Sequence, residues 1–173
     1  MKIENFNFTF DPTVVPFQYE KDGAVVAGWP TGSKVVDVVA NQEPSPPPIT
    51  WLIEAKDFRI ITKPPKPSNL TGLASTVDAK VRSSIAALPV VAVGSTDAAV
   101  KAHAAAAATA VAHRVVLHLE PHPAGGAHSL LFPLGFSAAV LMKLKQLVKD
   151  IDPNPMVLDI QRTARVGVPW SVV

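Results

Sequence analysis

One stretch, residues 51–61 with the sequence WLIEAKDFRII, constrains the fold more than any other part of the chain. β-Branched and aromatic residues dominate it and prolines precede it, which predicts a β-strand. Because side chains alternate across a strand, both faces would carry apolar residues, as is typical of a central strand covered on both sides. Glu54 and Lys56 would share one of these faces. Burying a carboxylate and an ammonium is costly unless they are paired or used, so these two residues are the first candidates for function.

The composition is that of a folded protein. At 173 residues, with 48% hydrophobic and 17% charged residues, the chain can bury a core, which excludes wholesale disorder and predicts one domain spanning residues 1–173. Cysteine does not occur, so disulfides and thiolate metal sites are excluded. No segment has the apolar length of a membrane span, and the first residues have no apolar signal core. We therefore expect a cytoplasmic protein without a membrane partner.

The order of the expected elements indicates the fold class. Proline and glycine separate segments with strand-like alternation from segments with helical periodicity. The expected strands comprise residues 6–10, 24–29, 34–40, 51–61, 114–120, 156–161 and 168–173, and the expected helices comprise residues 70–88, 97–108 and 137–151. A meander of three strands followed by a helical crossover into a further strand gives a mixed sheet. The sequence therefore predicts an α/β fold in which helices flank a mixed β-sheet.

The helix expected at residues 70–88 should cover this sheet with an apolar stripe. The residues at helical spacing that would form the stripe are Leu70, Leu73, Val77, Val81, Ile85 and Leu88. Asp78, Lys80 and Arg82 would lie on the polar side of the same helix. The stripe is expected to be core, with no cofactor implied.

A third charged residue, Asp37, joins Glu54 and Lys56 in the candidate site. A short proline-bearing connection joins residues 34–40 to residues 51–61, so we expect antiparallel neighbours with Asp37 across from Glu54. Two carboxylates and the backbone carbonyl of Ala55 would form a hard-oxygen site suited to Mg²⁺. The Lys56 ammonium could orient a water or stabilise developing charge, and phosphodiester hydrolysis needs this combination. A purely structural ion pair across the strands is the alternative interpretation.

These two segments together resemble a known family. VVDVV around Asp37, followed by WLIEAKDFR with Glu54 and Lys56, is similar to the signature of the PD-(D/E)xK nucleases, which have the restriction-endonuclease-like fold. In that family an acid on the second core strand is followed by an acid-x-Lys triplet on the third. The resemblance implies Asp37 and Glu54 as metal ligands and Lys56 as the catalytic lysine. The family often adds a glutamate from a preceding helix, for which Glu20 is the candidate.

The resemblance also implies an activity and its partners. The protein would be a hydrolase that cleaves nucleic acid, with DNA favoured over RNA and with Mg²⁺ or Mn²⁺ as its cofactor. A homodimer is compatible with this hypothesis. The alternative is a protein that keeps the nuclease fold without catalysis and serves as a nucleic-acid-binding or protein-interaction module.

Basic residues near the candidate site offer a path for a nucleic-acid backbone. They are Arg59, Lys63, Lys66, Lys80 and Arg82. Cations in such a row attract phosphates, but acids are interspersed, and ordinary surface charge explains the same pattern.

A second cluster of possible ligands is rich in histidine. It comprises His113, His118, Glu120, His122 and His128. Imidazole and carboxylate groups suit Zn²⁺, but these separations match no standard zinc motif. Histidines at a strand edge and in a loop are the alternative interpretation.

Overall fold

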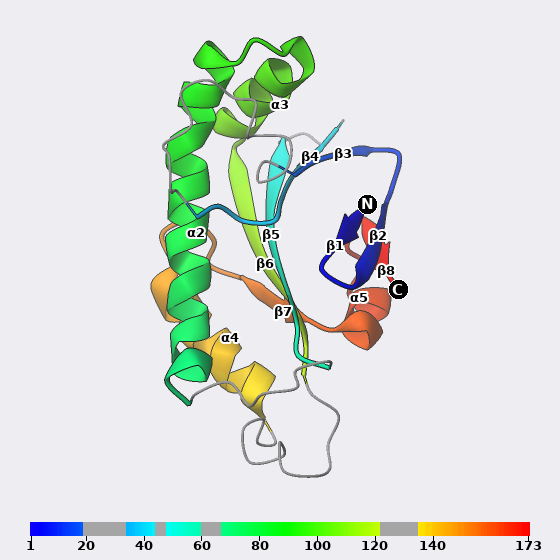
Figure 1. Ribbon diagram of the computed structural model, residues 1–173, viewed down its shortest axis with the longest axis vertical. Helices are drawn as coiled ribbons and strands as arrows, with labels where there is room; N and C mark the ends of the chain where they lie inside the picture. The colour runs from blue at the N-terminus through cyan, green and yellow to red at the C-terminus, as the bar shows by residue number, and fades with distance from the viewer. Residues whose placement is uncertain (19–33, 44–47, 60–66, 122–134) are drawn as a thin grey trace.

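The computed structural model describes residues 1–18, 34–43, 48–59, 67–121 and 135–173 (Figure 1). Its centre is a five-stranded sheet of order β3-β4-β5-β6-β7. The strands are β3 (Val14–Phe17), β4 (Val38–Gln42), β5 (Ile49–Asp57), β6 (Ala112–Glu120) and β7 (Met156–Leu158). β5 pairs antiparallel with β4 and parallel with β6, so the sheet is mixed. The predicted α/β class is therefore confirmed.

The meander contains the expected central pair but a different first strand. Val38 of β4 pairs with Ile53 of β5, which confirms the antiparallel neighbours. The strand on the other side of β4 is β3, which the sequence analysis did not predict. Pro16 is tolerated there because β3 lies at the edge of the sheet, where one row of backbone donors needs no partner. The strand expected at residues 24–29 lies outside the described residues.

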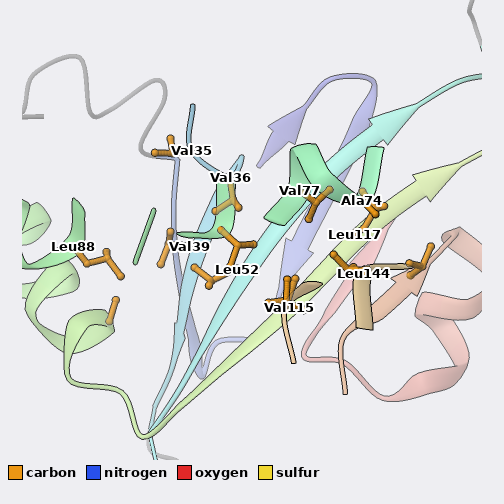
Figure 2. Close-up of a cluster of buried hydrophobic side chains, with 14 of the residues drawn as sticks. Val35, Val36, Val39, Leu52, Ala74, Val77, Leu88, Val115, Leu117 and Leu144 are labelled. Atoms are coloured by element: carbon orange, nitrogen blue, oxygen red, sulfur yellow. The ribbon is translucent and has the colours of Figure 1, made fainter. Parts of the chain in front are cut away.

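Helices cover one face of the sheet (Figure 1). They are α2 (Pro67–Gly94), α3 (Ala98–Ala108) and α4 (Phe136–Leu147). In the core beneath them, Val77 and Leu88 of α2 gather with Leu52 of β5, Leu117 of β6 and Leu144 of α4 (Figure 2). All five side chains are fully buried, so the predicted stripe does pack on the sheet. Burial of this apolar surface is what fixes α2 against the strands.

α2 is longer than predicted. The apolar stripe and Pro89 predict a helix that ends at Leu88, whereas the helix continues to Gly94 with the proline inside it. An interior proline removes one backbone hydrogen bond and crowds the preceding turn. Leu88 and Val91, on either side of it, are both fully buried, so side-chain packing holds the helix together. Within the described ranges, none of the helices combines the length and the apolar character that crossing a bilayer requires.

A second, smaller sheet covers the opposite face (Figure 1). It has the order β1-β2-β8 and consists of β1 (Lys2–Ile3), β2 (Phe6–Phe10) and β8 (Trp170–Val172). Phe6 and Phe8 are buried there in a cluster with Ile53 and Ala55 of β5. The expected strand at residues 6–10 is thus confirmed, and so is the prediction that β5 is covered on both faces.

The segment at residues 156–161 is only half strand. β7 ends at Leu158, and α5 (Ile160–Val166) begins directly after it. The Asp159 carboxylate accepts a hydrogen bond from the backbone N–H of Arg162 and so caps this helix. The predicted longer strand is wrong because a local capping side chain ends it.

Candidate active site

The candidate site lies where β5 extends past the beginning of β4. β4 begins at Val38, opposite Ile53, and Asp37 directly precedes it. Oδ2 of Asp37 accepts a hydrogen bond of 2.8 Å from the backbone N–H of Ala55. Because the N–H and C=O of one strand residue point to the same edge, the Ala55 carbonyl also faces the side of Asp37. The structure therefore brings together the segments that the sequence analysis expected to meet.

Glu54 is the buried centre of the site. Its side chain is 1% exposed, and both carboxylate oxygens accept hydrogen bonds of 2.9 Å from the Lys80 ammonium. Lys56 Nζ lies 2.9 Å from Oε1 of the same carboxylate. Burial and the neighbouring Asp37 raise the pKa of Glu54 above its ordinary value, and the two lysines counteract only part of this effect.

Lys80 is a site residue that the sequence analysis placed wrongly on the polar side of its helix. It projects from α2 and lies 3.8 Å from Oδ1 of Asp37, so both carboxylates converge on one ammonium. Its position three residues after Val77 puts it within the apolar stripe. Ser84, one turn further, is also buried and accepts a hydrogen bond from the backbone N–H of Val36. Polar residues at stripe spacing were the signal that could have identified Lys80.

Lys56 has a second carboxylate partner that no sequence pattern identifies. Glu4, in the turn between β1 and β2, accepts a hydrogen bond of 3.1 Å from Lys56 Nζ and one of 2.7 Å from the backbone N–H of Asp57. Its backbone φ is 51°, the left-handed region that non-glycine residues rarely adopt. Burial lowers the pKa of Lys56, but Glu54, Asp37 and Glu4 outweigh this effect and raise the pKa above its ordinary value.

An open pocket of about 270 Å³ gives solvent access to this cluster. The residues that line it are Lys2, Ile3, Glu4, Gln18, Asp37, Lys56 and Lys80. Asp37 and Lys56 are 13% and 26% exposed, whereas Glu54 lies beneath them. The site thus has an accessible rim, formed in part by Asp37 and Lys56, above a buried carboxylate, Glu54.

The donor set is compatible with a magnesium site of limited protein coordination. Asp37 and Glu54 supply carboxylate oxygens around one cation position, which the Lys80 ammonium holds here, and the backbone of Ala55 lies beside Asp37. The described part of the chain contains no group of three or more His, Cys, Asp or Glu side chains able to hold a metal. Mg²⁺ is commonly bound through one or two carboxylates, with water and substrate phosphates completing its shell. These residues therefore fit Mg²⁺ better than a metal that needs a full protein cage.

Other predicted site residues lie apart from this cluster or outside the described residues. Glu20, the expected additional glutamate, lies outside the described residues, as do Lys63 and Lys66. Arg59 forms a two-point ion pair with Asp57. Arg82 on α2 is paired with Asp78 and Asp150. The described members of the expected basic path are thus bound to acids rather than aligned for phosphates.

The histidines of the second cluster do not gather around a metal position in the described residues. His118 is fully buried between the aromatic rings of Phe6 and Phe8, with ring centroids 4.7 and 5.4 Å away. Its Nε2 lies 3.7 Å from Oε1 of Glu120, which confirms that these two side chains share a strand face. His113 instead contacts the backbone carbonyl of Ala107. His122 and His128 lie outside the described residues.

Comparison with protein-family models, with curated proteins and with solved structures finds no match for this chain.

Proposed function

We propose that this protein is a metal-dependent nuclease that hydrolyses phosphodiester bonds in nucleic acid, with DNA favoured over RNA. The observation that carries the proposal is the convergence of Asp37 and Glu54 on one cation position beside Lys56, beneath an open pocket. The order of elements around the site adds support. The antiparallel pair of β4 and β5 is followed by two helices, α2 and α3, and then by β6, which runs parallel to β5. Asp37 and the acid-x-Lys triplet of β5 come in the order that the PD-(D/E)xK signature has.

Each residue has a role that follows from its position. Asp37 and Glu54 would hold Mg²⁺ or Mn²⁺ together with the Ala55 carbonyl. The bound cation would neutralise the phosphate and make a coordinated water more acidic. Lys56 lies at the pocket rim, where its ammonium can stabilise charge that develops on the phosphate. The pairing with Glu4 holds Lys56 in a fixed direction, so little reorganisation is needed when charge develops.

A second candidate function is favoured by one specific contact. Lys80 binds both oxygens of Glu54 at 2.9 Å, so the carboxylate is already neutralised without a metal. A protein in which this ion-pair cluster only stabilises the fold would have the same contacts between Lys80 and Glu54. It would bind nucleic acid or another protein without cleaving anything.

A cleavage panel with single- and double-stranded DNA and RNA, with Mg²⁺ or Mn²⁺, separates the two candidates. The wild type should cut at least one substrate and bind the metal in calorimetry. Glu54→Gln should lose both properties, because a hard cation loses a charged oxygen ligand. Lys56→Met should still bind metal but cut about 100-fold more slowly, because it loses only the charge-stabilising group.

Asp150→Asn is the matched control. It removes a carboxylate that is 57% exposed and paired with Arg82 outside the pocket, so cleavage should be unchanged. A wild type that binds no metal and cuts none of the substrates would leave the non-catalytic candidate as the function.

A further inference from the structure

We propose that Lys80 is an internal counter-ion that holds the cation position between Asp37 and Glu54 and is displaced when a divalent metal binds. This inference rests on the proposed function, because it concerns the same acid pair. It assigns to the two lysines of the site different tasks: Lys56 remains in place during metal binding, and Lys80 leaves.

The position of the Lys80 ammonium supports this assignment. Nζ is equidistant from the two Glu54 oxygens, at 2.9 Å each, and lies 3.8 Å from Oδ1 of Asp37. It therefore sits in the chelating position of one carboxylate while facing the other. A divalent cation held by the same two carboxylates would share this small space with the ammonium. The ammonium of Lys80 fills this chelating position, so a metal ion can take the position only when Lys80 leaves, whereas Lys56 lies 2.9 Å from Oε1 alone, outside that position.

The partners of the two lysines distinguish them. Lys56 has a carboxylate outside the acid pair, Glu4 at 3.1 Å, and keeps this partner whatever Glu54 binds. Among the described residues, the ion pairs of Lys80 are with Glu54 and Asp37 alone. Metal binding would therefore take away both ion pairs that Lys80 forms with the described residues. Lys56 would keep its ion pair with Glu4.

The structure also offers the released ammonium a place to go. Lys80 lines the pocket above the site, and it also lines a second open hollow of about 310 Å³ along α2. Lys34, Ser75, Thr76, Ala79 and Ser83 complete the lining of that hollow, so solvent and hydroxyl groups rather than carboxylates would surround the ammonium there. Lysine has a flexible four-carbon stem and a strongly hydrated charge, so it can turn from one hollow to the other and exchange carboxylates for water. The helix backbone need not move.

The test is calorimetry with Mn²⁺ and Mg²⁺, together with thermal melting with and without the metal, on the wild type and Lys80→Met. Removing the competing ammonium should lower the dissociation constant for Mn²⁺ at least about tenfold. Metal should also raise the melting temperature of Lys80→Met more than that of the wild type, since two repelling carboxylates lose their counter-ion in the variant and regain one on binding. Lys101→Met, an exposed lysine on α3, is the control and should bind as the wild type does.

Equal or weaker metal binding by Lys80→Met would overturn the inference. So would a variant that melts lower and is not restored by metal, because that result describes a purely structural lysine. If Lys80→Met does not fold, Lys80→Gln keeps a hydrogen-bond donor without the charge and faces the same criteria.

The cleavage assay tests the proposed nuclease function, and metal binding by Lys80→Met tests the counter-ion, so the two can fail independently. A wild type that cuts nothing, with Lys80→Met binding metal more tightly, refutes the nuclease and retains the counter-ion. A wild type that cuts, with no gain in metal affinity from Lys80→Met, retains the nuclease and refutes the counter-ion. Metal binding by neither protein refutes both.

Discussion

His118 should make the stability of this protein depend on pH between about 4 and 6.5. Burial lowers the pKa of His118 from 6.5 to about 4, with Asp159 counteracting and Arg59 adding to the effect. The folded state therefore holds the imidazole neutral, while the unfolded state binds a proton more readily. Where the unfolded state binds more protons, stability rises with pH. The contribution is fully present above about pH 6.5 and is lost as the pH falls toward 4.

The size of the stability loss follows from how far the pKa of His118 is lowered in the folded state. About 2.5 pKa units correspond to about 3 kcal/mol when the loss is complete, at about 1.36 kcal/mol per unit. Between pH 7.5 and pH 5 the expected loss is about 2 kcal/mol. The side chain is fully buried, and its Nε2 has no hydrogen-bond partner among the described residues, so solvent screening does not reduce this figure much.

The assay is urea unfolding of the wild type and His118→Leu at both pH values. Leucine has a similar volume, fits between Phe6 and Phe8, and cannot titrate. At pH 7.5 the variant should be within about 1 kcal/mol of the wild type, since removing the buried Nε2, which has no hydrogen-bond partner among the described residues, offsets the change in shape and the loss of the 3.5 Å contact between Nδ1 and the Thr163 hydroxyl. From pH 7.5 to pH 5 it should lose about 2 kcal/mol less than the wild type. Equal losses in the two proteins would show that His118 is not held neutral by burial.

Three further predictions test the fold and the site. Val77→Asp should lower the free energy of unfolding, measured by urea titration, by about 3–5 kcal/mol, because it places an unpaired charge in the core under α2. A loss below about 1 kcal/mol would contradict this packing. Asp97→Ala should cost about 1 kcal/mol by the same measurement, since the carboxylate caps α3 through the N–H groups of Ala99 and Val100, and unchanged stability would mean that water replaces the cap. Glu4→Gln should change the free energy of unfolding, measured by thermal melting, by less than about 1 kcal/mol, because the ion pair of Glu4 with Lys56 is partly exposed. A larger loss would show that the turn between β1 and β2 depends on the charge of Glu4.

Much of the central fold could be predicted because its signals are local. Residues 51–61 contain enough β-branched and aromatic residues to identify a strand, and the stripe containing Val77 and Leu88 identifies the covering helix. The pairing of β4 with β5 followed from the short connection between them. β3 was missed because Pro12 and Pro16 suggest a broken chain, whereas an edge strand needs only one side of its backbone paired.

The candidate site could be predicted only as far as its residues lie on the central strands. Glu54 and Lys56 stand out because they interrupt an apolar strand, and Asp37 because it lies in an apolar segment, although the strand expected at residues 34–40 begins only at Val38, directly after it. Lys80 and Glu4 approach from elements far away in the sequence, so their roles depend on packing that local patterns do not encode. The spacing of Lys80 from Val77 indicates that Lys80 lies on the buried side of α2. The prediction placed it on the polar side instead, because a lysine on a helix usually faces water.

The shape of the sheet explains why the charges gather at this point. β5 runs past the start of β4, and beyond Ile53 the edge of β5 presents the backbone N–H groups of Ala55 and Asp57 to side chains instead of to β4. Asp37 accepts from the first with one oxygen and Glu4 from the second, while the other oxygen of each faces a lysine. The backbone N–H groups at this edge thus position the carboxylates of Asp37 and Glu4 through hydrogen bonds. The carboxylates in turn form ion pairs with the ammonium groups of Lys80 and Lys56. A shorter β5 would lose the donors that position these acids, so the overhang of one strand is the structural origin of the site.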